Sequence, residues 1–184
     1  MADFRLETER LILRDWREED WGPFWEGTNT PAVMRWLGGL ADQATMDAGR
    51  ERLERYQRDF GHTFWVVERK SDREILGFCG IKRCTDEEGP FGEIEAGWRL
   101  REDAWGKGYA KEAARATLDC AFEQFGAQQV IALTIKPNSA SWGLMEKLGM
   151  QRREDLDFEL TTFDPDNPHV IVYSITPEQW KASQ

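Results

Sequence analysis

The chain has few cysteines and histidines, and this scarcity limits the metal chemistry that it can support. Among its 184 residues, Cys79, Cys84 and Cys120 show no C-x-x-C spacing, and His62 and His169 are isolated. No zinc site is readable from such a pattern. We expect the thiols to be reduced and to fill the core. Because the N-terminal sequence also lacks the basic region and apolar stretch of a secretory leader, we expect a cytoplasmic protein.

A long hydrophobic run and an excess of basic residues are also absent. No segment approaches the ~18 apolar residues of a membrane helix, so we expect no membrane partner. Lys and Arg number 24 against 34 Asp and Glu, a net charge of -10. This balance argues against a nucleic-acid partner, although acidity mainly concerns solubility. The length, with 40% hydrophobic residues, predicts a single domain over 1–184 with a sizeable core.

Strand-like and helical patterns alternate along the chain, and no internal repeat is present. Hydrophobic spacing and turn residues predict the following elements. Strands are expected at 10–14, 63–68, 74–84, 93–100, 128–136, 150–160 and 170–176, and helices near 21–25 and at 30–38, 45–60, 108–125 and 139–148. The stretch 85–92, with Gly and Pro, is expected to be a polar loop. Hairpin links between several strands, with helices interspersed, indicate an α/β or α+β fold built on one mixed sheet.

The most informative motif is a glycine turn between a strand and the long alanine-rich helix. Gly106-Lys107-Gly108 lets the backbone turn tightly, and the helix that begins near Gly108 directs free N–H groups and a partial positive charge outward. Such a terminus can hold phosphate. The Walker A motif is absent, and the positions of Gly106, Gly108 and Ala110 do not fit a dinucleotide-binding turn. A purely structural strand-to-helix turn is the alternative.

Four segments in order carry a resemblance that spans nearly the whole chain. They read LETERLILRDWREEDW, ILGFCGI, EAGWRLREDAWGKGYAKEA and KPNSASWGLMEKLGM. Together they resemble the GNAT superfamily of acetyl-coenzyme A-dependent N-acetyltransferases, and within it the branch that includes ribosomal-protein N-terminal acetyltransferases. The resemblance implies one GNAT-type domain, with a mostly antiparallel central sheet flanked by helices. Its fourth and fifth strands would splay around acetyl-coenzyme A, and no metal would be needed.

The resemblance also implies which residues bind the cofactor. The family pattern Arg/Gln-x-x-Gly-x-Gly/Ala falls on Trp105, Gly108 and Ala110, so Trp105 departs from the usual polar residue. Backbone N–H groups from Gly106 to Ala110, a run that includes Lys107 and Tyr109, would hold the pyrophosphate. Lys107 would either add a charge or be a solvated loop residue.

The strand before the glycine turn and the helix after the next strand would complete the cofactor site. Trp98, Arg99 and Leu100 would lie along the pantetheine arm, with an N–H near Trp98 or Arg99 facing the thioester oxygen. Asn138 and Ser141 match the family's Asn-x-x-Ser, which approaches the cofactor near its sulfur. Asn138 could equally cap a helix, and Ser141 could be an exposed first-turn serine.

The implied reaction is direct attack of an amine on the acetyl thioester, which needs a base. Glu95 is the first candidate because it matches the acidic residue of the family's Glu-x-Gly-aromatic strand, and Glu93 is the second. The alternative is that both lie on the wet face of a half-buried strand. The Tyr that many members use as acid falls on Met145, which cannot donate a proton. Either Ser141 would donate it, or the thiolate would leave with help from Asn138 and water.

The acceptor is not specified beyond a peptide N-terminus or a small-molecule amine, and a monomer and a homodimer are both compatible with the sequence. Trp25, Trp36, Trp65 and Trp98 could line an acceptor groove, but periodic patterns favour core packing for Trp25 and Trp65. Both histidines are expected at the surface. An acyl-coenzyme A sensor without turnover remains the alternative to an enzyme.

Overall fold

One mixed sheet organises the structure, a computed structural model that describes residues 4–84, 89–161, 166 and 168–184. The strands are β1 (Arg5–Glu7), β2 (Leu11–Arg14), β3 (Phe64–Arg69), β4 (Ile75–Arg83), β5 (Ile94–Leu100), β6 (Val130–Ile135), β7 (Gln151–Arg152), β8 (Phe158–Glu159) and β9 (His169–Ile175). Their order is β1-β2-β3-β4-β5-β6-β9-β7, and β8 also pairs with β9. Every pairing is antiparallel except that of β5 with β6.

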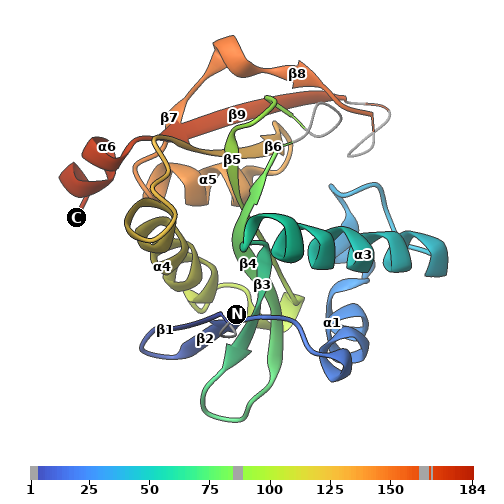
Figure 1. Cartoon of the computed structure of the whole chain (residues 1–184). Helices are drawn as coiled ribbons and strands as arrows, with labels where there is room; N and C mark the ends of the chain where they lie inside the picture. The colour runs from blue at the N-terminus through green and yellow to red at the C-terminus, as the bar shows by residue number, and fades with distance from the viewer. Residues whose placement is uncertain (1–3, 85–88, 162–165, 167) are drawn as a thin grey trace.

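Helices cover both faces of this sheet, as Figure 1 shows. They are α1 (Trp21–Thr28), α2 (Pro31–Met34), α3 (Gln43–Phe60), α4 (Tyr109–Glu123), α5 (Ser139–Lys147) and α6 (Pro177–Ala182), with short 3-10 turns η1 (Glu18–Asp20), η2 (Glu102–Ala104) and η3 (Glu154–Leu156). The α4 helix packs on one face of the sheet, and α1 and α3 pack on the other.

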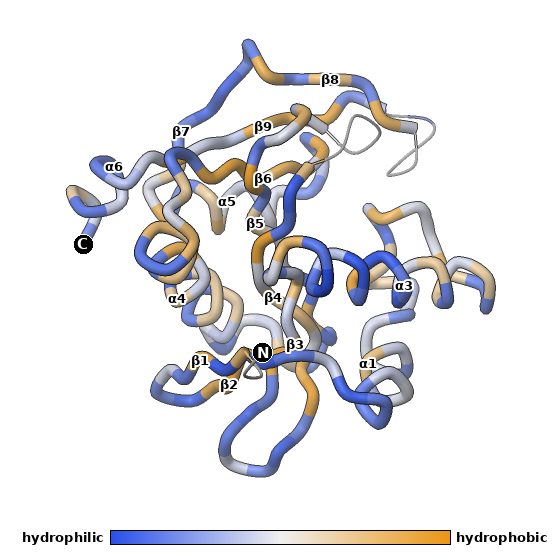
Figure 2. Tube along the Cα trace, viewed as in Figure 1, coloured by the Kyte–Doolittle hydropathy of each residue, from blue (hydrophilic) through white to orange (hydrophobic). Residues whose placement is uncertain are grey.

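The hydrophobic core is divided by the sheet in the same way. Alternating side chains of each strand point to opposite faces, so Trp65 belongs to the large cluster beneath α4, whereas the adjacent Phe64 belongs to the cluster beneath α1 and α3. Figure 2 shows the hydrophobic residues concentrated along the central strands and long hydrophilic stretches along α3. The sheet is therefore buried on both sides.

The strand-and-helix order predicted from the sequence is confirmed, with changes near the C-terminus. The strand expected at 150–160 is instead β7, η3 and β8, because Arg152 turns to pair with Asp157 and the chain bends at η3. The short β1 and α6 were not predicted. The sequence did contain a helix-start signal for α6, because Thr176 and Gln179 have the spacing of a capping box and form one. The polar loop expected at 85–92 lies partly outside the described residues.

The parallel pairing of β5 with β6 is short. β5 pairs with β4 from Gly77↔Leu100 to Arg83↔Ile94, but it meets β6 only at Ile94↔Val130 and Glu95↔Ile131. Beyond Glu95 the two strands separate, while β6 continues its pairing with β9. This confirms the expected splay of the fourth and fifth strands, which are β5 and β6 here because β1 precedes them.

The expectation for the thiols is confirmed, and the expectation for His62 is wrong. All three cysteines are buried and free, and burial raises the pKa of Cys79 and of Cys120 to about 12. His62 is also buried, because Gly61, at φ 72°, ends α3 and turns the chain inward. Its Nδ1 lies 3.1 Å from the Ile81 carbonyl oxygen, and burial lowers the pKa of the imidazole. His169 is exposed, as expected.

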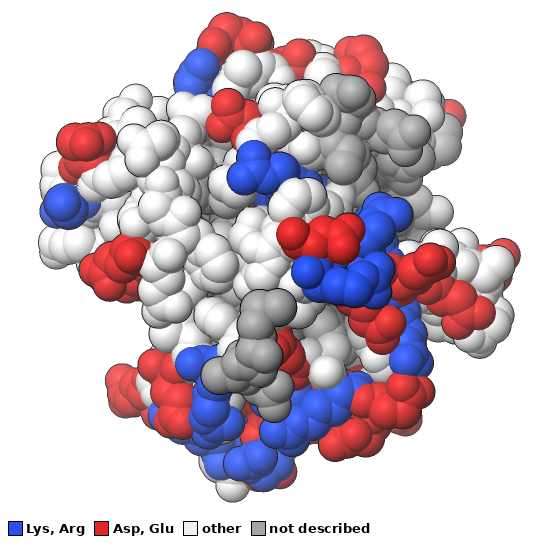
Figure 3. Space-filling model, viewed as in Figure 1, with Lys and Arg blue, Asp and Glu red and all other residues white. Residues whose placement is uncertain are grey.

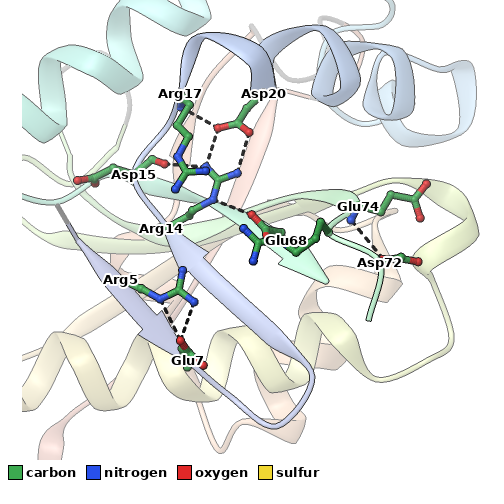
Figure 4. A network of polar contacts seen from close by, with 10 residues as sticks. Arg5, Glu7, Arg14, Asp15, Arg17, Asp20, Glu68, Asp72 and Glu74 are labelled. Atoms are coloured by element: carbon green, nitrogen blue, oxygen red, sulfur yellow. Dashed lines mark hydrogen bonds and ion pairs between the residues drawn. The ribbon is translucent and has the colours of Figure 1, made fainter. Parts of the chain in front are cut away.

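A buried ion-pair network attaches the start of α1 to the sheet (Figure 4). The guanidinium of Arg14 on β2 donates to both carboxylate oxygens of Asp20 at 2.7 and 2.8 Å, and to Glu68 on β3 at 2.8 Å. The hydrogen bonds to Asp20 are the main reason that the pKa of Arg14 is raised. Asp20 also accepts from the backbone N–H of Arg17 at 2.7 Å, so one carboxylate fixes both the turn and the strand.

We expect Asp20→Asn to lower the free energy of unfolding by about 3 kcal/mol, because it leaves the buried Arg14 charge without its main partner. Chemical denaturation monitored by circular dichroism measures the change. The control is Arg5→Gln, which removes the exposed pair of Arg5 with Glu7 and should cost less than about 1 kcal/mol. Equal losses in the two variants would contradict the role given to the buried network.

Candidate active site

The glycine turn has the geometry of an anion site. Gly106 and Gly108 have φ of 71° and 81°, in the left-handed region, and Gly108 is the N-cap of α4. The backbone N–H groups from Gly106 to Lys111 have no acceptor among the described residues, because the first helical bond runs from Glu112 N–H to the Gly108 carbonyl. These donors and the helix dipole point outward together.

Arg10, the residue just before β2, holds this turn in place through hydrogen bonds. Its Nη1 donates to the Lys107 carbonyl at 3.0 Å, and its Nε pairs with Glu112 at 2.7 Å. Glu112 also accepts from the Thr8 hydroxyl at 2.6 Å. The guanidinium carbon of Arg10 lies 4.4 Å from the centre of the Tyr109 ring. The shape of the turn is therefore fixed before any anion binds.

A cavity of about 1020 Å³ begins at the glycine turn and reaches α1, α2 and α3. It brings together most of the site residues predicted from the sequence. They are Glu95, Trp98, Arg99, Leu100, Trp105, Gly106, Gly108, Tyr109, Ala110, Asn138 and Ser141. Glu93 and Lys107 do not line it: Glu93 accepts from Gln129 Nε2 at 3.2 Å, and Lys107 is exposed. Lys111 lines the cavity at the glycine turn instead.

The free edge of β5 faces the gap left by β6. Arg101 N–H donates to the Leu76 carbonyl and Cys84 N–H to the Glu93 carbonyl, so the odd-numbered residues between them direct their backbone groups to β4. The N–H groups of Ala96 and Trp98 consequently point into the gap. The Leu100 carbonyl is already occupied, because it accepts from the Trp105 indole at 2.9 Å.

Glu95 is a buried carboxylate with one oxygen available. Its Oε2 lies 3.0 Å from Lys82 Nζ and 3.6 Å from the Cys84 thiol. Its Oε1 has no hydrogen-bond donor among the described residues, yet it is not sealed inside the protein. Lys82 lies directly across the β4–β5 ladder from Glu95. The ion pair therefore holds Glu95 in place while Oε1 can accept a hydrogen bond in the cavity.

The polar residues of α5 complete the wall opposite β5. The Asn138 side chain makes no capping hydrogen bond although it occupies the N-cap position of α5, which argues against the alternative that this side chain serves as a helix cap. Neither its amide nor the Ser141 hydroxyl has a hydrogen-bond partner among the described residues, so both are available to a ligand. Met145 is buried and lines the same wall.

The tryptophans separate into core and cavity residues. Trp65 is fully buried in the cluster beneath α4, as expected. Trp25 packs only partly against the second cluster and lines the cavity together with Trp36 and Trp98. The expectation that Trp25 is a core residue is therefore wrong in part, because this indole is only half-buried and also borders the cavity.

The sequence patterns did not predict that Lys82 and residues at α2 and α3 line the cavity. Arg35, Arg52 and Lys82 line the cavity, although no motif marks them. Lys82 could have been found, because strands 74–84 and 93–100 are joined by a short loop and an antiparallel ladder sets Lys82 opposite Glu95. The two arginines are placed by packing of α2 and α3, which periodicity does not reveal.

An anion-binding helix terminus, a splayed sheet edge and a carboxylate around one cavity define an acyl-coenzyme A-dependent transferase. The model of the "Acetyltransferase (GNAT) domain" matches residues 10–151. The chain belongs to this family of acetyl-coenzyme A-dependent N-acetyltransferases, whose acceptors are amines.

The comparisons with individual proteins agree. The uncharacterized protein YkkB of Bacillus subtilis (strain 168) is 35% identical over 150 residues, which cover 81% of this chain and 86% of YkkB. The uncharacterized N-acetyltransferase YnaD of the same strain is 29% identical, over 80% of this chain and 82% of YnaD. The crystal structure of the acetyltransferase from Agrobacterium tumefaciens str. C58 superposes with a TM-score of 0.79 at 27% identity, covering 95% of each chain.

Within the part of the chain that the structure describes, no helix is long and apolar enough to cross a membrane. The same residues contain no group of three or more His, Cys, Asp or Glu side chains placed to hold a metal ion.

We expect Gly108→Val to reduce coenzyme A affinity at least tenfold, because a side chain at φ 81° strains the turn and its Cβ meets Arg10 Nη2 at 3.4 Å. Titration calorimetry with coenzyme A measures the loss. Gly126→Val is the matched control: Gly126 also has a left-handed φ, 63°, but lies beyond the other end of α4 with open space around it. If both variants bind coenzyme A like the wild type, the glycine turn is not the anion site.

Proposed function

We propose that this protein transfers the acetyl group of acetyl-coenzyme A to a primary amine by direct attack within the described cavity. The observation that carries the proposal is the convergence of three elements on one space: the free N–H groups at the start of α4, the unpaired edge of β5, and the open oxygen of Glu95. A binding module would need the first two but not a carboxylate held with one oxygen free.

The cofactor fits along the β5–β6 gap. The N–H groups from Gly106 to Ala110 would hold the pyrophosphate, and Lys111 would supply the charge that we expected from Lys107. The amides of the pantetheine arm would pair with the edge of β5 as an added strand. Of the two N–H groups considered for the thioester oxygen, we favour that of Trp98, because the Arg99 N–H faces β4.

The reaction begins with an amine that is mostly protonated at neutral pH. Glu95 Oε1 would accept a proton from the ammonium group through a water molecule, and the neutral amine would attack the thioester carbon. The Trp98 N–H would stabilise the negative charge that develops on the thioester oxygen. As this intermediate collapses, its nitrogen gives up its second proton to water, the C–S bond breaks, and the neutral amide and the coenzyme A thiolate are formed.

The released thiolate can take its proton from Ser141. The hydroxyl has no partner in the described chain and belongs to the same cavity wall as Asn138. Met145, at the position where many members carry Tyr, cannot serve. Release without a protein acid, with Asn138 and water assisting, is the other route, because a thiol pKa near ~8.5 makes the thiolate a tolerable leaving group.

The acceptor could be a small-molecule amine or a peptide N-terminus. The resemblance of the motifs to the ribosomal-protein branch supports a peptide, whereas the aromatic lining by Trp25 and Trp36 supports a compact apolar body beside the amine. We also infer that the reaction takes place in the cytoplasm, because all three cysteines are free thiols.

Glu95→Gln should lower kcat about 100-fold at neutral pH, because the amide cannot accept the ammonium proton. Coenzyme A affinity should stay within a factor of about three. The loss should shrink at pH values where the amine is already neutral, and a pH series of thiol release shows this. Glu93→Gln is the control, since Glu93 lies outside the cavity, and its rate should be close to that of the wild type. An unchanged rate and pH profile in Glu95→Gln would refute its role as base.

Ser141→Ala separates the two routes for thiolate release. If the serine donates the proton, kcat should fall about tenfold or more, and the solvent deuterium isotope effect on kcat should change. The variant Ser139→Ala is the control, because Ser139 is an exposed residue at the start of the same helix. A wild-type rate in Ser141→Ala would leave water as the proton source.

A further inference from the structure

The charge of the cavity is opposite to that of the chain. Figure 3 shows acidic and basic side chains mixed over α3 and the β3–β4 hairpin, and the whole chain carries a net charge of -10. Among the described residues that line the cavity, the single carboxylate is Glu95. The basic ones are Arg35, Arg52, Lys82, Arg99, Lys111 and Lys147. Lys111 suits the phosphates of the cofactor, but Arg35, Arg52 and Arg99 lie on the acceptor side, toward α2 and α3.

Among these basic residues, Arg99 has the least favourable surroundings for a charge. Odd-numbered side chains of β5 point toward α1 and α3, so Arg99 shares a face with Glu95. Its guanidinium carbon lies 5.9 Å from the centre of the Trp25 ring and 5.2 Å from that of Phe78. Its Nε is shut off from solvent and has no hydrogen-bond acceptor, and no carboxylate pairs with it in the described chain.

A comparison with Arg14 shows that this is unusual within the same molecule. Arg14 is buried with two carboxylates, Asp20 and Glu68, as a charge removed from water requires. Arg99 is half-buried with its Nε sealed from solvent, and its contacts among the described residues are with two aromatic rings, which offset little of the cost of desolvation. Burial, with a smaller repulsion from Arg52, lowers the pKa of Arg99 to about 10. Among the described residues, Arg99 is therefore a cation without an acidic partner beside the proposed reaction centre.

We propose that Arg99 binds a carboxylate of the acceptor, so that the substrates of this acetyltransferase are amines that also carry an acid group, such as free amino acids. This inference rests on the proposed function, because it assumes that the amine is acetylated in this cavity. A guanidinium binds a carboxylate through two parallel hydrogen bonds. Such binding would satisfy the nitrogen that has no partner in the free protein.

The spacing along β5 is compatible with one small molecule bridging the two charged residues. Gly97 lies between Glu95 and Arg99 on the same face, about 7 Å along the strand from each. A Cβ at Gly97 would meet the Phe64 ring at 2.5 Å, so an aromatic ring forms the floor between the two charges. An amine near Glu95 and an acid near Arg99 would thus lie over an apolar surface.

Matched pairs of amines test the proposal. We would measure kcat/KM for L-phenylalanine against L-phenylalaninamide, and for β-alanine against β-alaninamide, by thiol release. In Arg99→Gln, kcat/KM for the acid divided by kcat/KM for the amide should be about tenfold or more lower than in the wild type. In Arg99→Lys this ratio should lie between those two values. Because the intrinsic pKa of each amine is the same with every enzyme variant, the change in ratio reports the contact with the carboxylate.

Arg35→Gln is the matched control. Arg35 also lines the cavity, but it is exposed and lies against the Trp36 ring. If Arg99 makes a direct contact, the ratio in Arg35→Gln should change less than about twofold. A similar fall in both variants would show a general field effect and overturn the proposal, as would an unchanged ratio in Arg99→Gln.

A stability measurement distinguishes this role from a structural one. Removing a half-buried cation that has no acidic partner among the described residues should raise the thermal unfolding midpoint of the ligand-free protein, and for Arg99→Met we expect an increase of at least about 2 °C. A structural arginine would instead give a lower midpoint. A lower midpoint in Arg99→Met, with the selectivity ratio intact, would assign Arg99 to the fold and end the proposal.

Product binding gives a result that does not depend on turnover. With coenzyme A present, N-acetyl-L-phenylalanine should raise the unfolding midpoint of the wild type more than N-acetyl-L-phenylalaninamide does, and Arg99→Gln should abolish the difference. Equal shifts in the wild type overturn the carboxylate proposal. Failure of the proposed function looks different: coenzyme A would not bind, or no amine of either class would release thiol.

Discussion

The separation of β5 from β6 is the constraint on which the site depends. A parallel pair that continued beyond Glu95 would satisfy the backbone groups of Ala96 and Trp98 and leave no edge for an extended ligand. The separation is tolerated because each strand is held on its other side, β5 by β4 and β6 by β9. The unpaired edge then lies beside the N-terminus of α4, so a strand-like ligand with a charged end fits both.

The ionisable groups of the molecule follow two different rules. In the Arg14 network every charge has a partner, and the network fixes α1 on the sheet. In the cavity the Lys82–Glu95 pair leaves Glu95 Oε1 open, and Arg99 has no acidic partner within the part of the chain that the structure describes. Groups that lack partners among the described residues thus lie where a ligand would bind. Proteins generally depart from locally favourable arrangements at their functional sites.

Much of the fold could be predicted from the sequence because each element has a local cause. Thr30 with Pro31 starts α2, Gly61 ends α3, and Gly149 follows α5 at a left-handed φ of 82°. The cofactor side was readable for the same reason, since it is one continuous segment around Gly106 and Gly108. The acceptor side was not, because α1, α2, α3 and β5 assemble it from distant parts of the chain. The burial of His62 and the surroundings of Arg99 depend on that packing.

Side chains along β5 alternate between the two faces of the sheet, so each residue of this strand faces either the cluster beneath α4 or the helices α1 and α3. Ala96, Trp98 and Leu100 direct their side chains to the cluster beneath α4 and their N–H groups to the gap. Glu95 and Arg99 face α1 and α3. An insertion or deletion of one residue in this strand would exchange the two faces, so that both charges would enter the apolar cluster. Point substitutions can therefore retune the acceptor within this strand, but the number of its residues must stay fixed.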